Sequence, residues 1–239
     1  MKEFSLQLYS LRDIPTLRER VRIAAEAGYT GVEFAGYEQY SAAELKALLA
    51  EFGLKAVGSH VSIEALRSDL SGEIAYAKEV GMETVACPYI EMSTYEQAAE
   101  AAAYLETCAL QFAEAGIPFG YHNHNHEFAQ TDDGRYLLEV LMEKAPHVQM
   151  ELDVFWAKYA GVDPLAFIEK HSGRFFLLHF KEIAENKDNV ELGRGIQDFA
   201  ALAKTGFAQG TRHIVVEQEG YTMPPAESVT VDAAYMKAL

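Results

Sequence analysis

Cysteine is scarce in this 239-residue sequence, which contains only Cys87 and Cys108. Two cysteines are too few for a disulfide scaffold, and they fit a protein from a reducing compartment. The sequence also has no run of about 18 apolar residues that would span a membrane. Its first residues, Met1 to Phe4, lack the apolar segment of a signal peptide. We therefore expect a cytoplasmic protein without a membrane partner.

Basic residues are also few, with 20 Lys and Arg against 36 Asp and Glu, which gives a formal net charge of −16. Such a charge argues against binding to the phosphate backbone of nucleic acid or to an anionic membrane, and it favours cations. The composition is 49% hydrophobic, and no linker or low-complexity stretch divides the chain. We expect residues 1–239 to form one domain around a single core.

One sequence pattern recurs along the chain: an amphipathic helix, a glycine and a short apolar run. The glycines Gly28, Gly53, Gly81, Gly116 and Gly206 stand where a helix end needs a left-handed residue. Capping-box spacing marks three helix starts, at Thr16-x-x-Glu19, Ser41-x-x-Glu44 and Ser93-x-x-Glu96. A fourth start is marked by Asp163-Pro164, where a proline follows the expected cap. The pattern indicates repeated strand and helix units.

The apolar runs are continuous, as expected for buried parallel strands. There are eight of them: Phe4–Tyr9, Gly31–Phe34, Ala56–Ser59, Thr84–Pro88, Phe119–His122, Val148–Asp153, Phe175–Phe180 and His213–Glu217. Eight strands with about eight helices between them predict an α/β fold of the TIM (β/α)8 barrel type. An open doubly wound sheet is the alternative, but no G-x-G-x-x-G follows an early strand to support its nucleotide-binding form.

Polar residues gather at the carboxyl ends of these runs, which is the face of a TIM barrel that carries chemistry. The densest group is the segment Phe119–Phe128, with three His, two Asn and one Glu. The other candidates are Gln7, Glu33, His60, Asp153, His179, Lys181 and Glu217. Carboxylates with a single imidazole suit Mn²⁺, Mg²⁺ or Co²⁺, and Zn²⁺ is a further possibility. Such an ion stabilises the enediolate formed when a sugar loses a proton next to its carbonyl group.

The sequence resembles the xylose isomerase-like TIM barrel superfamily, which includes the sugar phosphate isomerase/epimerase group and endonuclease IV. The resemblance covers essentially the whole chain. It is carried by Gln7-Leu8-Tyr9-Ser10-Leu11-Arg12-Asp13, Tyr121-His122-Asn123-His124 with Glu127-Phe128, Leu152-Asp153, Leu178-His179-Phe180-Lys181, Gly193-Arg194-Gly195 and Val216-Glu217.

The resemblance implies one divalent metal ion held by Glu, Asp, His and Glu on strands five to eight. Asp153, His179 and Glu217 match directly. At the first Glu position the chain has His122, so either Glu127 reaches back or His122 or His124 replaces the carboxylate. We favour Glu127 because it restores the charge.

The resemblance also suggests roles for three further residues, whereas the other candidates come from their positions in or near the carboxyl ends of the apolar runs. Lys181 and Arg194 would face substrate hydroxyls or a developing oxyanion, and Trp156 stands where epimerases tend to have a substrate-contacting His. Glu217 and Glu127 are the candidate acid and base, with Lys181 and His124 as further catalytic candidates. The remaining substrate candidates are Gln7, Glu33, His60 and His122.

These residues predict a metal-dependent isomerase or epimerase of a sugar or cyclitol. A dehydratase or lyase that acts on a keto-sugar or 3-keto-glycoside through the same enolate is the nearest alternative. More distant ones are a Schiff-base aldolase using Lys181, an abasic-site endonuclease with three zinc ions, and a non-catalytic relative. We expect no nucleic-acid partner, and a homodimer in which the partner helps to cover the barrel mouth is possible.

Overall fold

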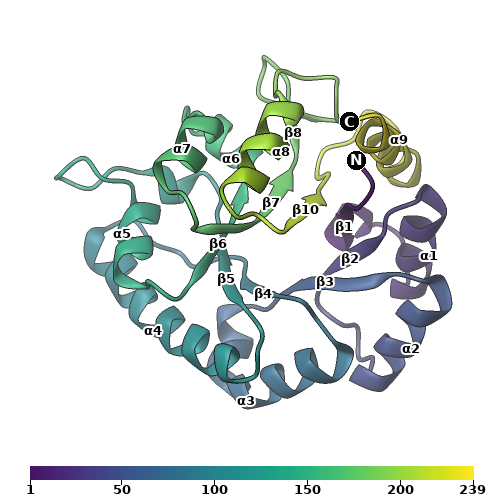
Figure 1. Cartoon of the computed structure of the whole chain (residues 1–239), viewed down its shortest axis with the longest axis horizontal. Coiled ribbons are helices and arrows are strands. Elements are labelled where there is room, and N and C mark those ends of the chain that lie inside the picture. The colour runs from purple at the N-terminus through teal and green to yellow at the C-terminus, as the bar shows by residue number, and fades with distance from the viewer.

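Eight parallel strands close into a barrel in the computed structural model, which describes residues 1–239 (Figure 1). The strand order around the barrel is β1-β10-β7-β6-β5-β4-β3-β2. Their bounds are Ser5–Gln7 (β1), Gly31–Ala35 (β2), Lys55–His60 (β3), Val85–Cys87 (β4), Phe119–His122 (β5), Gln149–Asp153 (β6), Phe175–Phe180 (β7) and His213–Val216 (β10). Because β1 pairs with both β2 and β10, the sheet has no edge. The TIM barrel prediction is confirmed, and the open sheet is wrong.

Helices surround the barrel (Figure 1). The α-helices span Leu17–Ala27 (α1), Ala42–Phe52 (α2), Ile63–Val80 (α3), Tyr95–Glu114 (α4), Leu137–Lys144 (α5), Val154–Tyr159 (α6), Pro164–Lys170 (α7), Phe199–Ala208 (α8) and Pro225–Ala238 (α9). Two 3-10 helices span Leu8–Leu11 (η1) and His126–Phe128 (η2). None of the helices has the length and apolar character needed to cross a membrane.

The sequence signals at the helix ends are mostly confirmed. Ser41 forms a complete capping box with Glu44. Two signals are wrong by a few residues. The cap of α4 is Thr94, not Ser93, and Gly206 lies inside α8, while Gly210 takes the left-handed conformation. A Cβ atom on Gly206 would lie 2.6 Å from a methyl group of Leu178, so close helix packing is the reason for that glycine.

A short antiparallel hairpin after β7 was not predicted. It pairs β8 (Glu182–Ile183) with β9 (Asn189–Val190). The buried Glu182 carboxylate accepts hydrogen bonds from backbone N–H groups of Ile183, Gly193 and Gln197. The sequence could not predict these strands, because two residues are too few to show a periodic pattern of apolar and polar side chains.

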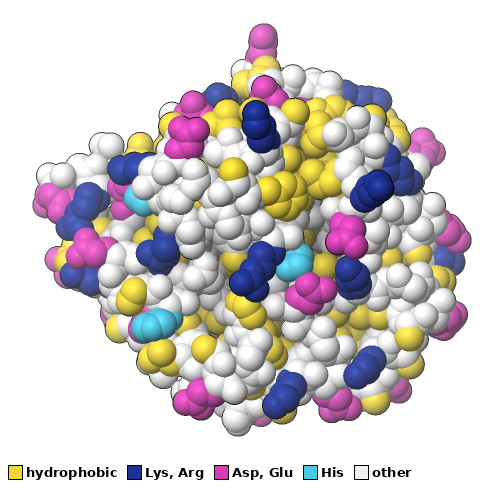
Figure 2. Space-filling view, in the orientation of Figure 1, with side chains coloured by type: hydrophobic (Ala, Val, Ile, Leu, Met, Phe, Trp, Pro, Cys, Tyr) yellow, Lys and Arg dark blue, Asp and Glu magenta, His cyan; other side chains and the backbone are white.

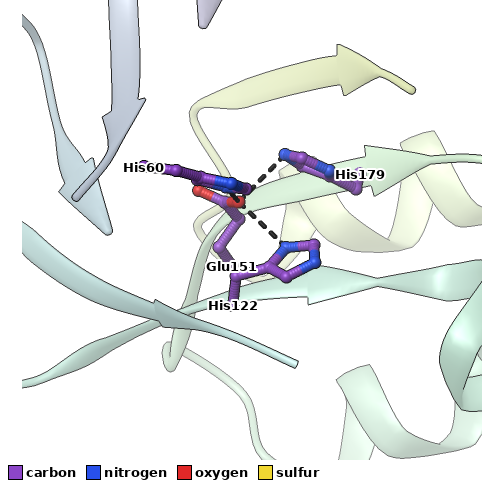
Figure 3. A group of neighbouring side chains, drawn as sticks. All are labelled: His60, His122, Glu151 and His179. Atoms are coloured by element: carbon purple, nitrogen blue, oxygen red, sulfur yellow. Dashed lines mark hydrogen bonds and ion pairs between the residues drawn. The ribbon is translucent and has the colours of Figure 1, made fainter. Parts of the chain in front are cut away.

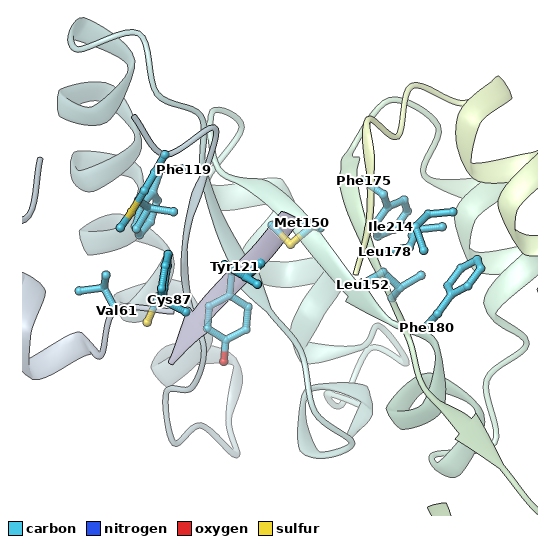
Figure 4. Packing of buried hydrophobic residues seen from close by; sticks show 14 of the residues in the cluster. Val61, Cys87, Phe119, Tyr121, Met150, Leu152, Phe175, Leu178, Phe180 and Ile214 are labelled. Atoms are coloured by element: carbon cyan, nitrogen blue, oxygen red, sulfur yellow. The ribbon is translucent and has the colours of Figure 1, made fainter. Parts of the chain in front are cut away.

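Most of the hydrophobic core lies between the strands and the helices, in one cluster of 61 buried residues. Figure 4 shows part of it, including Phe119, Leu152 and Phe180 on successive barrel strands. Val215 belongs to a second cluster of only four residues, although its neighbours Ile214 and Val216 belong to the large one. Because side chains alternate across a strand, the small cluster lies inside the barrel. The rest of the interior is available for polar groups.

A buried acid on α9 predicts how stability depends on pH. Asp232 accepts a hydrogen bond from the Leu192 N–H at 2.7 Å, its other oxygen has no partner, and burial raises its pKa to about 7. The folded protein therefore keeps a proton that the unfolded chain releases, and stability falls as the pH rises from about 4 to 7. We expect Asp232→Asn to be free of this loss and more stable at pH 8, by at most about 4 kcal/mol.

Urea unfolding of both proteins between pH 4.5 and 8 measures this difference. Asp198→Asn, at the exposed cap of α8, is the matched control and should behave like the wild type. A constant difference between Asp232→Asn and the wild type across this range would contradict the prediction.

Candidate active site

Four metal-capable side chains meet at the carboxyl ends of neighbouring strands. They are His122 at the end of β5, Asp153 at the end of β6, His179 in β7 and Glu217 directly after β10. One ligand atom from each lies within 4.8 Å of the others, and all four residues are buried. We call them the donor group. Neighbouring parallel strands bring them together although the chain separates His122 from Glu217 by almost a hundred residues.

One oxygen of the Asp153 carboxylate accepts no hydrogen bond in the protein. Its Oδ1 accepts a hydrogen bond from the Trp156 N–H at 3.0 Å and caps α6, whereas the buried Oδ2 has a long ion-pair contact, 3.8 Å from Nζ of Lys181. Burial raises the pKa of Asp153 to about 7, although the nearby charge of Lys181 opposes the shift. A buried carboxylate oxygen without a hydrogen bond, in a cluster of donors, is a position that a cation would satisfy.

Glu151 lies beneath the donor group, two residues before Asp153 and on the same face of β6. Three imidazole nitrogens approach its Oε1: Nε2 of His60 at 2.6 Å, Nδ1 of His122 at 3.0 Å and Nε2 of His179 at 2.9 Å (Figure 3). Glu151 was not singled out from the sequence. The sequence signal that could have found it is its spacing of two residues from Asp153, which places both side chains on one face of β6.

The carboxylates of Glu151 and Glu33 fix the orientation of both imidazoles in the donor group. Nε2 of His179 lies 2.7 Å from Oε2 of Glu33, and its Nδ1 faces Glu217 at 3.1 Å. When Nδ1 of His122 donates to Glu151, its Nε2 keeps a lone pair. Burial lowers the pKa of His122 to about 4. Burial alone would lower the pKa of His179, but the negative charges of Glu151 and Glu33 outweigh the effect of burial and raise it. A proton on His179 would therefore compete with a metal ion.

Lys181 is a fully buried cation beside the donor group. Its Nζ lies 2.7 Å from a carboxylate oxygen of Glu219, 3.7 Å from Glu217 and 4.8 Å from the ring centre of Trp156. Burial disfavours the charge, but Glu217 and then Asp153 outweigh it and raise the pKa of Lys181. The side chain is therefore an ammonium at neutral pH. A Schiff-base aldolase needs a free amine, so this environment argues against that alternative.

The structure does not bring Glu127 to the donor group. Its carboxylate accepts hydrogen bonds from the Tyr121 hydroxyl at 2.7 Å and the His124 N–H at 2.8 Å, and it lies 3.2 Å from Nδ1 of His126. Tyr121 belongs to the outer hydrophobic cluster, and it points away from the barrel interior because it alternates with His122 along β5. Glu127 therefore braces the loop after β5, and His122 is the β5 side chain that lies within the donor group.

Two other predicted substrate residues do not line the cavity described below. Arg194 is tied to Glu191 at 3.2 Å and to the Thr222 hydroxyl at 2.9 Å, outside the cavity described below. Gln7 is buried in the barrel and donates to Glu33 at 2.9 Å. Both side chains are placed by contacts that exist only in the folded chain, so the sequence alone could not predict their positions.

A cavity of about 630 Å³ opens above the donor group. His60, His122, His124, Glu217 and Glu219 line it, and none of its fifteen lining residues is Lys or Arg. Burial, with smaller effects from His122 and Lys181, lowers the pKa of His124 to about 2. This imidazole is therefore neutral and can form hydrogen bonds with a ligand. A cavity of this size fits a small molecule.

The surface in Figure 2 carries basic side chains scattered among acidic ones, without a continuous basic patch on the face shown. A face of this kind offers no track of cations for a phosphate backbone.

Comparisons with known proteins agree with this architecture. A family model for the xylose isomerase-like TIM barrel matches residues 21–239. A sugar phosphate isomerase/epimerase from Parabacteroides distasonis superposes with a TM-score of 0.85 at 24% identity, covering 99% of this chain and 94% of that one. For the 3-keto-D-glucoside 4-epimerase from E. coli the TM-score is 0.77 at 16% identity, and both chains are covered completely, at 100%.

A third similar structure is an AP endonuclease, family 2, from Brucella melitensis, with a TM-score of 0.78 at 22% identity over 98% of this chain and 99% of that one. At these identities the structures share the fold. No curated protein sequence matches the chain.

Proposed function

The chain belongs to the xylose isomerase-like TIM barrel family, and we propose that it is a metal-dependent isomerase or epimerase of a sugar or cyclitol. One observation carries the proposal: two members of the donor group, His122 and Glu217, line a cavity that has no Lys or Arg among its lining residues. Hydroxyl and carbonyl oxygens of a neutral polyol can bind there without a phosphate-binding cation.

The donor group fits one divalent cation. It offers two imidazole nitrogens and two carboxylates from His122, Asp153, His179 and Glu217, and one buried oxygen of Asp153 accepts no hydrogen bond. With His122 in place of Glu127, half of the donors are nitrogen, which favours Zn²⁺, Co²⁺ or Mn²⁺ over Mg²⁺.

The protein side chains account for binding and proton transfer. A bound divalent ion would polarise the substrate carbonyl and stabilise the charge that develops when the adjacent C–H bond loses its proton. Glu217 lines the cavity and is the candidate base that removes this proton. Returning this proton to the carbonyl carbon, while the proton of the adjacent hydroxyl moves to the former carbonyl oxygen, gives an isomer. An epimer forms when a second group delivers a proton to the original carbon from the face opposite to Glu217. Lys181 lies 3.7 Å from Glu217 and keeps its carboxylate ionised, and the neutral His124 positions hydroxyl groups.

Solvent deuterium incorporation tests the proposal. A panel of neutral keto-sugars and cyclitol ketones is incubated with the metal-loaded protein in D2O and analysed by NMR. We expect metal-dependent exchange at a carbon next to the carbonyl, which stops on chelation and resumes when metal is added. Exchange with loss of water or an aglycone would identify the lyase alternative. Exchange that survives exhaustive chelation would contradict the metal-dependent mechanism.

Glu151 provides a prediction about the support of the metal site. Glu151→Gln replaces the carboxylate that orients His122 and His179. Loss of such an outer partner typically reduces metal affinity by about 10 to 100-fold. Competition titration of Zn²⁺ against a fluorescent chelator measures the change. Glu79→Gln, on the exposed side of α3, is the control and should not alter the affinity, and an unchanged affinity of Glu151→Gln would contradict the orienting role.

A further inference from the structure

The cavity extends well beyond the donor group. Only His122 and Glu217 of its lining residues belong to that group. Most of the others come from the loops after β1 to β4 and from α3, such as Tyr9, Tyr37, Glu73 and Tyr89. We call these four residues the outer subsite. A single sugar ring bound at the donor group would leave this part of the cavity unfilled.

Two tyrosines at the rim expose an unusual amount of aromatic surface. Tyr9 is 44% exposed and Tyr89 is 50% exposed, and both line the cavity. The Tyr89 ring packs against both His124 and His126, at 5.7 Å and 5.0 Å between ring centres. The Arg12 guanidinium lies 4.8 Å from the centre of the Tyr9 ring. Both rings are thus fixed by neighbours and can pack against the apolar face of a bound ring.

The wall on the side of α3 contains two polar atoms without partners. They are the hydroxyl of Tyr37 and Oε2 of Glu73, both buried. The Tyr37 ring stacks on Tyr76 of α3 at 4.3 Å between centres. A buried polar atom without a hydrogen bond is costly, so these two groups indicate a ligand with hydroxyls on this side.

A break in α3 places Glu73 at this wall. Asp69 has a non-helical backbone (φ −154°, ψ 71°), and its carboxylate accepts a hydrogen bond from the Gly72 N–H at 2.9 Å. The helix therefore starts again after Asp69, and Glu73 lies in its new first turn. A Cβ atom on residue 72 would lie 2.2 Å from the Asp69 carboxylate, so a larger residue there would displace the capping side chain.

We propose that the outer subsite binds the second sugar ring of a neutral glycoside whose reacting ring lies at the donor group. The absence of Lys and Arg from the lining argues against a phosphate on this second group. The hydroxyl of Tyr37 and the carboxylate of Glu73 favour a carbohydrate over a purely aromatic group, because only the carbohydrate can bond to both. This assignment rests on the proposed function, which places the reacting ring.

Calorimetric titration of the Zn²⁺-loaded protein with D-glucose, maltose, cellobiose and trehalose tests the outer subsite. We expect at least one disaccharide to bind about tenfold or more tightly than D-glucose, the gain that corresponds to one buried hydrogen-bonded contact. Tyr37→Phe and Tyr89→Ala should each remove most of this gain and leave binding of D-glucose unchanged. Phe207→Ala, which removes an exposed ring on α8 away from the cavity, is the matched control and should keep the gain.

The outcomes separate this inference from the proposed function. Disaccharides that bind no more tightly than D-glucose, or variants that weaken both sugars equally, would overturn the outer subsite, even if metal-dependent deuterium exchange is observed. A tyrosine-dependent gain for a disaccharide without any metal-dependent exchange would support the subsite and contradict the proposed reaction.

Discussion

Asp153→Asn is expected to reduce the affinity for a divalent cation by at least about 100-fold, since loss of an outer partner alone costs up to that much. The metal-free protein should remain close to the wild type in stability. Asn can still accept the hydrogen bond from the Trp156 N–H, and Lys181 keeps Glu217 and Glu219 as ion-pair partners when it loses the contact with Asp153 at 3.8 Å. Titration with Zn²⁺ and calorimetric unfolding in a chelator measure the two effects.

Asp163→Asn is the matched control, because Asp163 caps α7 in the same way at an exposed position. It should leave the metal affinity unchanged. Retained affinity in Asp153→Asn would contradict its role as a ligand. A large loss of metal-free stability would show that the residue is mainly structural.

Glu217→Gln should reduce metal-dependent deuterium exchange by about 10²–10⁴-fold, the range for loss of a positioned general base. His122, Asp153 and His179 remain to hold a cation, so metal binding should weaken without disappearing. Measuring both the deuterium exchange rate and the metal affinity of Glu217→Gln separates loss of the base from loss of the metal ion.

Glu227→Gln, on the exposed first turn of α9, is the control and should exchange at the wild-type rate. Exchange in Glu217→Gln within a factor of about three of the wild type would show that another group removes the proton.

The barrel could be predicted from the sequence because its strands are continuous apolar runs. The bounds of β5 and β7 agree with the predicted runs Phe119–His122 and Phe175–Phe180. Buried parallel strands must be apolar on both faces, so the pattern follows from the architecture itself. The hairpin of β8 and β9 depends on the Glu182 carboxylate and nearby backbone N–H groups, and these contacts leave no trace in a hydropathy pattern.

The donor group was only partly predictable. The sequence placed Asp153, His179 and Glu217 at strand ends, and barrel geometry then brings strand ends together. The choice of Glu127 over His122 rested on charge balance, whereas the alternation of side chains along β5 directs His122 inward and Tyr121 outward. Glu151 was missed because its importance comes from three imidazoles that converge on it only in the folded chain.

Anomalous diffraction from crystals grown with Zn²⁺ or Mn²⁺ tests the donor group most directly. We predict one ion per chain, about 2.0–2.3 Å from ligand atoms of His122, Asp153, His179 and Glu217. An ion bound by Glu127 in place of His122, or three ions per chain, would contradict the proposed site, and a protein that binds no ion at these residues would contradict the proposed chemistry.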